Sequence, residues 1–112
     1  AKEKFGKKFL EASFPMSRVD RAHTDRAKSG FLEVRFLPGG RILGATIISR
    51  HAGELIHEWA LAISQGLTVD RIAYTLHSYP TYGVAAMQLA AEVQTRRTIK
   101  GLRGKLLRRL AR

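Results

Sequence analysis

The sequence predicts a single domain that combines a β-hairpin with helices. Residues 31–37 alternate between apolar and polar side chains, and residues 42–49 resume a strand pattern after a Pro-Gly-Gly turn. Residues 52–65 then carry apolar side chains at helical spacing. The chain has 112 residues, of which 45% are hydrophobic, so it is large enough to bury a core of its own.

The first elements of the chain are the least regular. Residues 9–14 mix apolar and polar side chains and end at Pro15, which predicts a short strand at the edge of a sheet. Residues 17–27 are mostly polar. In that segment Ser17 is a candidate helix cap, and residues 20–22 predict a single helical turn.

The hairpin that follows is the clearest strand prediction. Leu32, Val34 and Phe36 fall on one face of the first strand, which indicates that this strand is half-buried. Residues 38–41 form the turn, because proline presets φ and glycine accepts positive φ there. Gly44 interrupts the return strand and therefore indicates a β-bulge or a close backbone approach.

Three helices are predicted after the hairpin. The first covers residues 52–65 and ends at Gly66. Its apolar face is interpreted as core or as part of an interface, and consists of Leu55, Ile56, Trp59, Ala60 and Ile63. A short helix over residues 69–74 has Thr68 as its cap, and a third helix over residues 83–93 is rich in alanine, which permits close packing.

The net charge of +11 is concentrated at the two ends of the chain. Residues 1–7 form a basic tail, and residues 95–112 predict a basic amphipathic tail helix that contains two glycines. The apolar stripe of this tail helix consists of Ile99, Leu102, Leu106 and Leu110. The middle of the chain is nearly balanced in charge, so solvated tails are a better interpretation than a nucleic-acid-binding surface.

The sequence contains no cysteine, which excludes a disulfide framework, a thiolate zinc site and a redox pair within these residues. No run of about 18 apolar residues occurs, and the first residues lack the apolar stretch of a secretion signal. We therefore expect a cytoplasmic setting.

Four motifs occur in order along the chain, at residues 40–45, 51–56, 66–69 and 79–81. Together they resemble the C-terminal dimerisation domain of the FAD-dependent pyridine nucleotide-disulfide oxidoreductases, the family of glutathione reductase, dihydrolipoamide dehydrogenase and mercuric reductase. The resemblance covers roughly residues 8 to 93, and places a dimerisation domain at residues 8–94.

The resemblance implies an α+β domain, with an antiparallel β-sheet flanked by helices, that forms a homodimer across a twofold axis. In that family the FAD and NAD(P) domains precede this one. Neither a G-x-G-x-x-G fingerprint nor a cysteine pair occurs here, so the chain is interpreted as a fragment that holds no cofactor and is not active alone. The parent enzyme would use FAD and NAD(P)H.

The chain departs from the family pattern at two positions. Members that reduce disulfides place a His before the proline and a Glu five residues after that His, whereas the present chain has Tyr79 and Val84. A phenol with a pKa near 10 is a poor base at neutral pH. Tyrosine in this region resembles the mercuric-reductase-like members, and the resemblance also implies a cis bond between Tyr79 and Pro80.

The same resemblance gives the candidate site residues. Tyr79 and His77 are the candidate catalytic residues, and Pro80 and Thr81 are the candidate cofactor contacts. Tyr79 could project into the partner subunit's active site or simply cover the turn. His77 could replace the missing base, but a structural role is favoured because no carboxylate is evidently placed to orient it.

A metal site on the first helix is considered and rejected. His51, Glu54 and His57 are spaced by three residues, so the two imidazoles drift apart around the helix. We expect instead that His51 caps the helix and that Glu54 pairs with His57.

Two alternatives from other functional classes remain open. A free-standing nucleic-acid-binding protein would use the basic tail, although strands that interleave aromatic and basic residues are lacking. The same tail could contact an anionic membrane surface. Either activity could coexist with a dimerisation domain.

Overall fold

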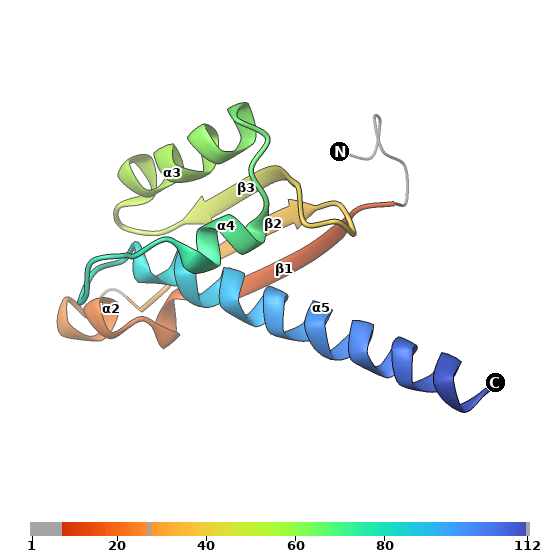
Figure 1. Ribbon diagram of the computed structural model, residues 1–112. Coiled ribbons are helices and arrows are strands. Elements are labelled where there is room, and N and C mark those ends of the chain that lie inside the picture. The colour runs from red at the N-terminus through yellow and green to blue at the C-terminus, as the bar shows by residue number, and fades with distance from the viewer. Residues whose placement is uncertain (1–7, 27, 112) are drawn as a thin grey trace.

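The computed structural model describes residues 8–26 and 28–111, so the predicted basic tail over residues 1–7 lies outside the described part. Three antiparallel strands form one sheet in the order β1-β2-β3 (Figure 1). They are β1 (Leu10–Pro15), β2 (Phe31–Phe36) and β3 (Ile42–Ile48). Helices pack on this sheet, so the predicted α+β class is confirmed.

One face of the sheet is buried, as the alternation in the sequence predicts. Leu32, Val34 and Phe36 of β2 are almost inaccessible to solvent. In the neighbouring strand β1, Phe14 lies opposite Leu32 and Ala12 opposite Val34, so both strands present their apolar side chains to the same side. As expected, β1 is an edge strand that ends at Pro15.

The predicted irregularity at Gly44 is present. Arg35 pairs with Gly44 but the next residue, Phe36, pairs with Ile42, so Leu43 is an extra residue in β3. The turn before β3 closes through a hydrogen bond from the amide of Gly40 to the carbonyl of Leu37, at 2.7 Å.

The segment between β1 and β2 contains a 3₁₀ turn, η1 (Met16–Arg18), and a short helix, α2 (Asp20–Thr24). The predicted helical turn at residues 20–22 is therefore confirmed, but the predicted cap is wrong. Ser17 lies within η1, and Val19 occupies the position before α2 without a side-chain hydrogen bond to it.

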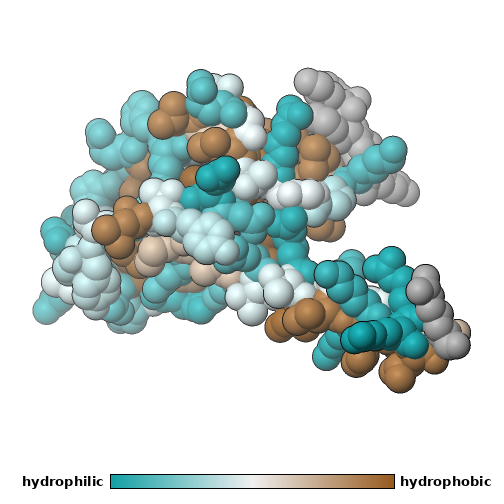
Figure 2. Space-filling model, in the orientation of Figure 1, coloured by the Kyte–Doolittle hydropathy of each residue, from teal (hydrophilic) through white to brown (hydrophobic). Residues whose placement is uncertain are grey.

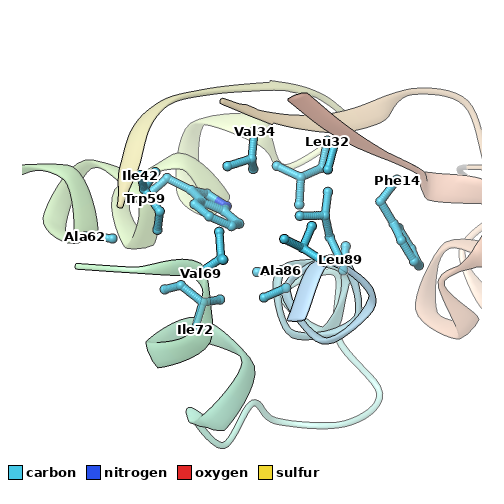
Figure 3. Packing of buried hydrophobic residues seen from close by; sticks show 14 of the residues in the cluster. Phe14, Leu32, Val34, Ile42, Trp59, Ala62, Val69, Ile72, Ala86 and Leu89 are labelled. Atoms are coloured by element: carbon cyan, nitrogen blue, oxygen red, sulfur yellow. The ribbon is translucent and has the colours of Figure 1, made fainter. Parts of the chain in front are cut away.

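Three helices follow the sheet: α3 (Ala52–Ser64), α4 (Val69–Tyr74) and α5 (Val84–Leu110). The core lies where these helices meet the buried face of the sheet. The side chains that converge there include Leu32, Val34, Trp59, Val69 and Leu89 (Figure 3). Trp59, for which core and interface are both considered above, is 1% exposed and belongs to the core.

The apolar face predicted for α3 is only partly right. Trp59 is buried and Leu55 half-buried, whereas Ala60 and Ile63 are exposed. Ala62 is buried instead. The buried stripe is narrower than predicted because α3 covers the sheet along β3 and leaves its outer side in solvent.

Thr68 stands at the cap position of α4, as predicted, but its side chain makes no capping hydrogen bond. The amide of Val69 instead donates to the carbonyl of Gly40, at 2.9 Å, and Arg41 forms an isolated bridge with Thr68. Backbone contacts between the hairpin turn and the start of α4 thus take the place of the side-chain cap.

The two helices predicted near the C-terminus are one continuous helix of 27 residues. Gly101 and Gly104 each cost about 1 kcal/mol relative to alanine, but neither ends α5, whose final turns extend beyond the rest of the domain (Figure 1). Within the described residues, no helix combines the length and the apolar character needed to cross a membrane.

Candidate functional site

The candidate site is the turn between α4 and α5, which carries all four residues singled out from the sequence. The Tyr79-Pro80 peptide bond is cis, as the resemblance implies. Three large apolar side chains in and next to this turn are turned to solvent: Tyr74 is 78% exposed, Leu76 95% and Tyr79 70%. Such a concentration of exposed apolar surface is typical of an interaction site.

Tyr79 does not extend freely into solvent. Its hydroxyl donates a hydrogen bond to Oδ2 of Asp20 in α2, with 2.5 Å between the oxygens. This bond and the negative charge of Asp20 raise the pKa of Tyr79 above its usual value near 10. Tyr79 is therefore a neutral phenol at pH 7, able to donate a proton in a hydrogen bond but not to act as a base.

A second tyrosine forms a parallel pair three residues later. The hydroxyl of Tyr82 donates to Oδ2 of Asp25, at 2.8 Å, and the same carboxylate accepts a bond from Nε of Arg21, at 3.0 Å. Burial, and then Asp25, raise the pKa of Tyr82. The bonds from Tyr82 and from Arg21 lower the pKa of Asp25.

Two tyrosine–aspartate pairs therefore tie the turn to α2 and the residue that follows it. The edge of the Tyr82 ring also contacts the ring of His51, with 4.9 Å between centroids. His51 stands at the N-cap position of α3, as predicted, but its side chain makes this aromatic contact and no capping hydrogen bond.

His77 has the carboxylate partner that the sequence failed to reveal. Its Nε2 is hydrogen-bonded with Oε1 of Glu58 in α3, at 2.5 Å, and its Nδ1 with the carbonyl of Thr75, at 2.8 Å. The His77 side chain is only 9% exposed. Because both ring nitrogens are engaged, the imidazole has no lone pair directed at an outside group.

The missed residues, Glu58 and Asp20, could not be found by spacing along the chain. Glu58 lies 19 residues from His77, and Asp20 lies 59 residues from Tyr79. No local pattern links residues at such separations, and only the packing of α2 and α3 against the turn brings them together.

The candidate cofactor contacts lie at the surface of the turn. Pro80 is exposed, and the hydroxyl of Thr81 donates to the carbonyl of Ser78 within the turn, at 2.5 Å. A groove of about 190 Å³ lies between β1 and α5, and another hollow of about 290 Å³ lies beside Tyr74 and Ile99. Residues 77–81 line neither of them.

Cofactor pockets usually enclose about 300–1,000 Å³ and most of the ligand's surface. An open turn with an internally bonded Thr81 does not meet that description. Residues 77–81 therefore do not fit as a flavin pocket of their own, although an exposed turn can form one wall of a pocket that other residues complete.

Metal-binding groups do not gather in the described part of the chain: no three His, Cys, Asp or Glu side chains lie close enough together to hold an ion. Glu54 and His57 are exposed on α3, and His51, which stands just before α3, is also exposed although its ring contacts that of Tyr82. No hydrogen bond joins Glu54 to His57, both of which are described, so the predicted local pair is wrong. Solvent screening leaves little to hold an exposed pair together.

The chain is similar to one domain of a known family of enzymes. A family model for the pyridine nucleotide-disulphide oxidoreductase dimerisation domain matches residues 1–90. Dihydrolipoyl dehydrogenase from Geobacillus stearothermophilus is 42% identical over 85 residues, which are 75% of this chain and 18% of that protein. The same enzyme from Halobacterium salinarum is 39% identical over 79 residues, which are 70% and 17% of the two chains.

Solved structures show the same fold at lower identity. LpdA from Mycobacterium tuberculosis superposes with a TM-score of 0.76 and 22% identity, over 82% of this chain and 20% of that one. The flavoprotein disulfide reductase RclA from Escherichia coli, solved as a Cu(II) complex, gives 0.75 and 18%, over 81% and 21%. The chain thus spans about a fifth of the length of the relatives it matches.

Proposed function

This chain belongs to the pyridine nucleotide-disulphide oxidoreductases and carries their dimerisation domain, and on this premise we propose that it joins two copies of a longer FAD-dependent enzyme. In the dimer, Tyr79 is contributed to the partner subunit's active site. The observation that carries the proposal is the exposure of the apolar side chains Tyr74, Leu76 and Tyr79 around one turn.

A second copy of the chain is the natural cover for this turn. Leu76 is almost completely exposed, and burying a leucine contributes about 1.5–3 kcal/mol. A twofold interface presents the same patch from both sides, so each exposed side chain is used twice. A specific interface of this kind buries about 1,200–2,000 Å² in total.

In the composite site Tyr79 would offer its exposed ring and the lone pairs of its hydroxyl oxygen, because its one O–H proton is donated to Asp20. Its raised pKa keeps the hydroxyl protonated at neutral pH, and its bond to Asp20 fixes the ring's direction. FAD, when bound by the parent enzyme, would carry electrons between NAD(P)H and the substrate. The part of this chain is limited to the exposed turn, in which Pro80 and Thr81 would form one wall of that site.

His77 would be a positioning residue in this arrangement. Its two hydrogen bonds join the turn to α3 through Glu58 and close the backbone at Thr75. The turn on which Tyr79 stands is therefore held from two sides, by Asp20 of α2 and by Glu58 of α3.

The residues at positions 79 and 84 indicate the substrate class of the parent enzyme. Tyr79 and Val84 replace the His and Glu that disulfide-reducing members use to exchange protons, which supports a mercuric-reductase-like enzyme. The relatives above are named dihydrolipoyl dehydrogenases, which makes dihydrolipoamide the competing substrate. Assays of the full-length enzyme should show NAD(P)H oxidation that depends on Hg(II); turnover of dihydrolipoamide instead would contradict the assignment.

Light scattering after size-exclusion chromatography tests the dimer. We expect the chain at high concentration to have twice the 12.5 kDa mass of one copy, and Leu76→Asp to reduce it to a monomer because the charge cannot be buried unpaired. Leu61→Asp is the matched control, since Leu61 is 62% exposed on α3, away from the turn. A wild-type monomer, or equal effects of the two variants, would count against the proposal.

A further inference from the structure

The exposed half of α5 carries an amphipathic pattern that the dimerisation function does not use. Five apolar side chains beyond residue 98 are between 49% and 76% exposed: Ile99, Leu102, Leu106, Leu107 and Leu110. In Figure 2 apolar surface runs along the lower side of the projecting arm, facing away from the body of the domain. The "tail stripe" below means Ile99, Leu102, Leu106 and Leu110.

The tail stripe is not a continuation of the face that α5 packs against its own core. The buried residues of the first half include Ala86, Leu89, Ala90 and Val93. At 100° per residue, the centre of the tail stripe is rotated by roughly 130° around the helix from the centre of that buried set. The domain's own sheet therefore cannot cover the tail stripe while α5 stays one helix.

Basic side chains lie on both edges of the tail stripe. Helical spacing places Lys105 and Arg109 along one edge and Lys100 and Arg103 along the other. Residues 94–111 contain seven Arg or Lys and no Asp or Glu. Only one of these seven has an acidic partner among the described side chains, since Arg97 pairs with Asp70 at 2.8 Å.

These charges decide what can cover the tail stripe. A second copy of the tail would bring the same positive charges together without a carboxylate to pair with them, so self-association is opposed. A partner must be anionic where it meets the edges and apolar where it meets the leucines. A bilayer with anionic headgroups has both properties, and basic residues flanking an apolar face are typical of helices that lie in its interface.

We propose that the second half of α5 binds anionic membrane surface, with the tail stripe placed among the acyl chains and the flanking Lys and Arg among the headgroups. This goes beyond the dimerisation function. Ile99 shares a hollow with Tyr74, but the three leucines of the tail stripe lie further along α5 than any residue of that hollow. A dimer would carry two such helices.

Flotation with lipid vesicles tests the proposal on the 112-residue chain. Vesicles of phosphatidylcholine with roughly a quarter phosphatidylglycerol should capture the protein, whereas pure phosphatidylcholine should capture far less. Leu102→Gln with Leu106→Gln should weaken capture by about tenfold or more, because these side chains no longer enter the apolar layer. Glutamine keeps a good helix propensity, so α5 should stay folded, as circular dichroism would confirm.

Matched controls use exposed side chains elsewhere on the domain. Leu61→Gln on α3 should leave capture within about twofold of wild type. Lys105→Gln with Arg109→Gln should weaken capture by about thirtyfold, as roughly one kcal/mol per basic residue predicts. Arg41→Gln with Arg71→Gln removes the same charge from the hairpin turn and α4, and should have much less effect.

Several outcomes would overturn the proposal. They are failure of anionic vesicles to capture the chain, equal capture of wild type and the Leu102/Leu106 variant, and an equal loss in both charge variants. Salt-sensitive binding of duplex DNA that ignores the leucine substitutions, together with no vesicle capture, would assign the tail to nucleic acid instead.

Discussion

Asp20 and Asp25 each accept a hydrogen bond from a tyrosine, yet the two tyrosines differ in exposure. Tyr82 is 6% exposed, whereas Tyr79 is 70% exposed, so only the second can meet another subunit. The pair with Tyr82 is a structural anchor at the start of α5. The pair with Tyr79 holds an exposed ring in one direction without burying it.

The bond to Asp20 should be visible in the ionisation of Tyr79. Because the carboxylate accepts the phenol's proton and repels the phenolate, Asp20→Asn should lower the pKa of Tyr79 towards the ordinary value near 10. Absorbance of tyrosinate as a function of pH measures this. The substitution should have no comparable effect in a Tyr79→Phe background; an equal effect there would mean that another tyrosine is responsible.

The same bond has a defined pH window for stability. The pKa of Tyr79 is raised in the folded protein. The bond between Tyr79 and Asp20 therefore contributes fully to the free energy of unfolding below the unfolded pKa near 10, and this contribution is lost as the pH rises through the folded pKa. In the second pair the pKa of Asp25 is lowered by its bonds from Tyr82 and Arg21. The contribution of Asp25 to the free energy of unfolding is therefore present above about pH 3.8 and is lost as the pH falls through the folded pKa. The turn is thus anchored throughout the neutral range.

At this scale the sequence revealed the residues but not their partners. Tyr79, His77, Pro80 and Thr81 are adjacent in the chain, and a motif placed them on one turn. Asp20 and Glu58 reach that turn only through tertiary packing, which one sequence does not encode in any local spacing. The sequence favours a structural role for His77 because no carboxylate is evident near it, and the carboxylate that the structure adds is that of Glu58.

Among the elements, the strands were predictable because they depend on local alternation. Leu32, Val34 and Phe36 define the buried face of β2 with period two, and Gly44 marks the bulge in β3. That the two helices predicted near the C-terminus form one continuous helix, α5, was not predictable in this way. The low helix propensity of Gly101 and Gly104 predicts a weak helix there. The helix continues because the residues around them, Leu102, Arg103 and Lys105, have high helix propensity, which outweighs a cost of about 1 kcal/mol for each glycine.

Replacing either of two glycines by alanine should change the free energy of unfolding, but in opposite directions. Gly30 has a φ of 107°, and a Cβ there would lie 1.9 Å from the carbonyl oxygen of Ile48, so Gly30→Ala should destabilise the domain by about 2 kcal/mol or more. Gly53 lies in α3 with nothing within 4 Å of a built Cβ, so Gly53→Ala should stabilise it by about 0.5–1 kcal/mol.

Urea unfolding followed by circular dichroism measures both changes under the same conditions. The comparison isolates backbone geometry, because each variant adds a single methyl group. A neutral Gly30→Ala variant would show that β3 and the segment before β2 do not approach as closely as the structure indicates.

On the scale of the whole molecule, α5 belongs to both the core and the tail. Its first half packs under the sheet, and Arg97 still reaches back to Asp70. Beyond Arg97 the helix makes few contacts with the domain (Figure 1). The predicted boundary between a domain at residues 8–94 and a tail at residues 95–112 therefore falls within a continuous helix and stays a prediction.

Truncation tests where the folded domain ends. A chain that stops after Thr98 should lose less than about 0.5 kcal/mol of unfolding free energy, since the residues removed are exposed. A chain that stops after Gln94 should lose up to about 1 kcal/mol more, because the partly exposed pair between Arg97 and Asp70 is removed. Urea unfolding gives both values; equal stabilities would show that this pair contributes nothing.

The family was recognisable from four ordered motifs, and the family model and the relatives confirm it. The narrower likeness to mercuric reductase rested on Tyr79 and Val84 alone. Two side chains on a surface turn can indicate which chemistry is missing, but the substrate also depends on residues that the parent enzyme supplies outside these 112.

The unbroken course of α5 has a mechanical consequence. About sixteen residues separate Gln94 from Leu110, which as straight helix corresponds to a stiff rod of roughly 24 Å. No hinge lies between the far end of this rod and the residues beneath the sheet. Whatever grips the far end therefore also sets the tilt of the entire domain, and with it the direction in which the aromatic ring of Tyr79 is offered.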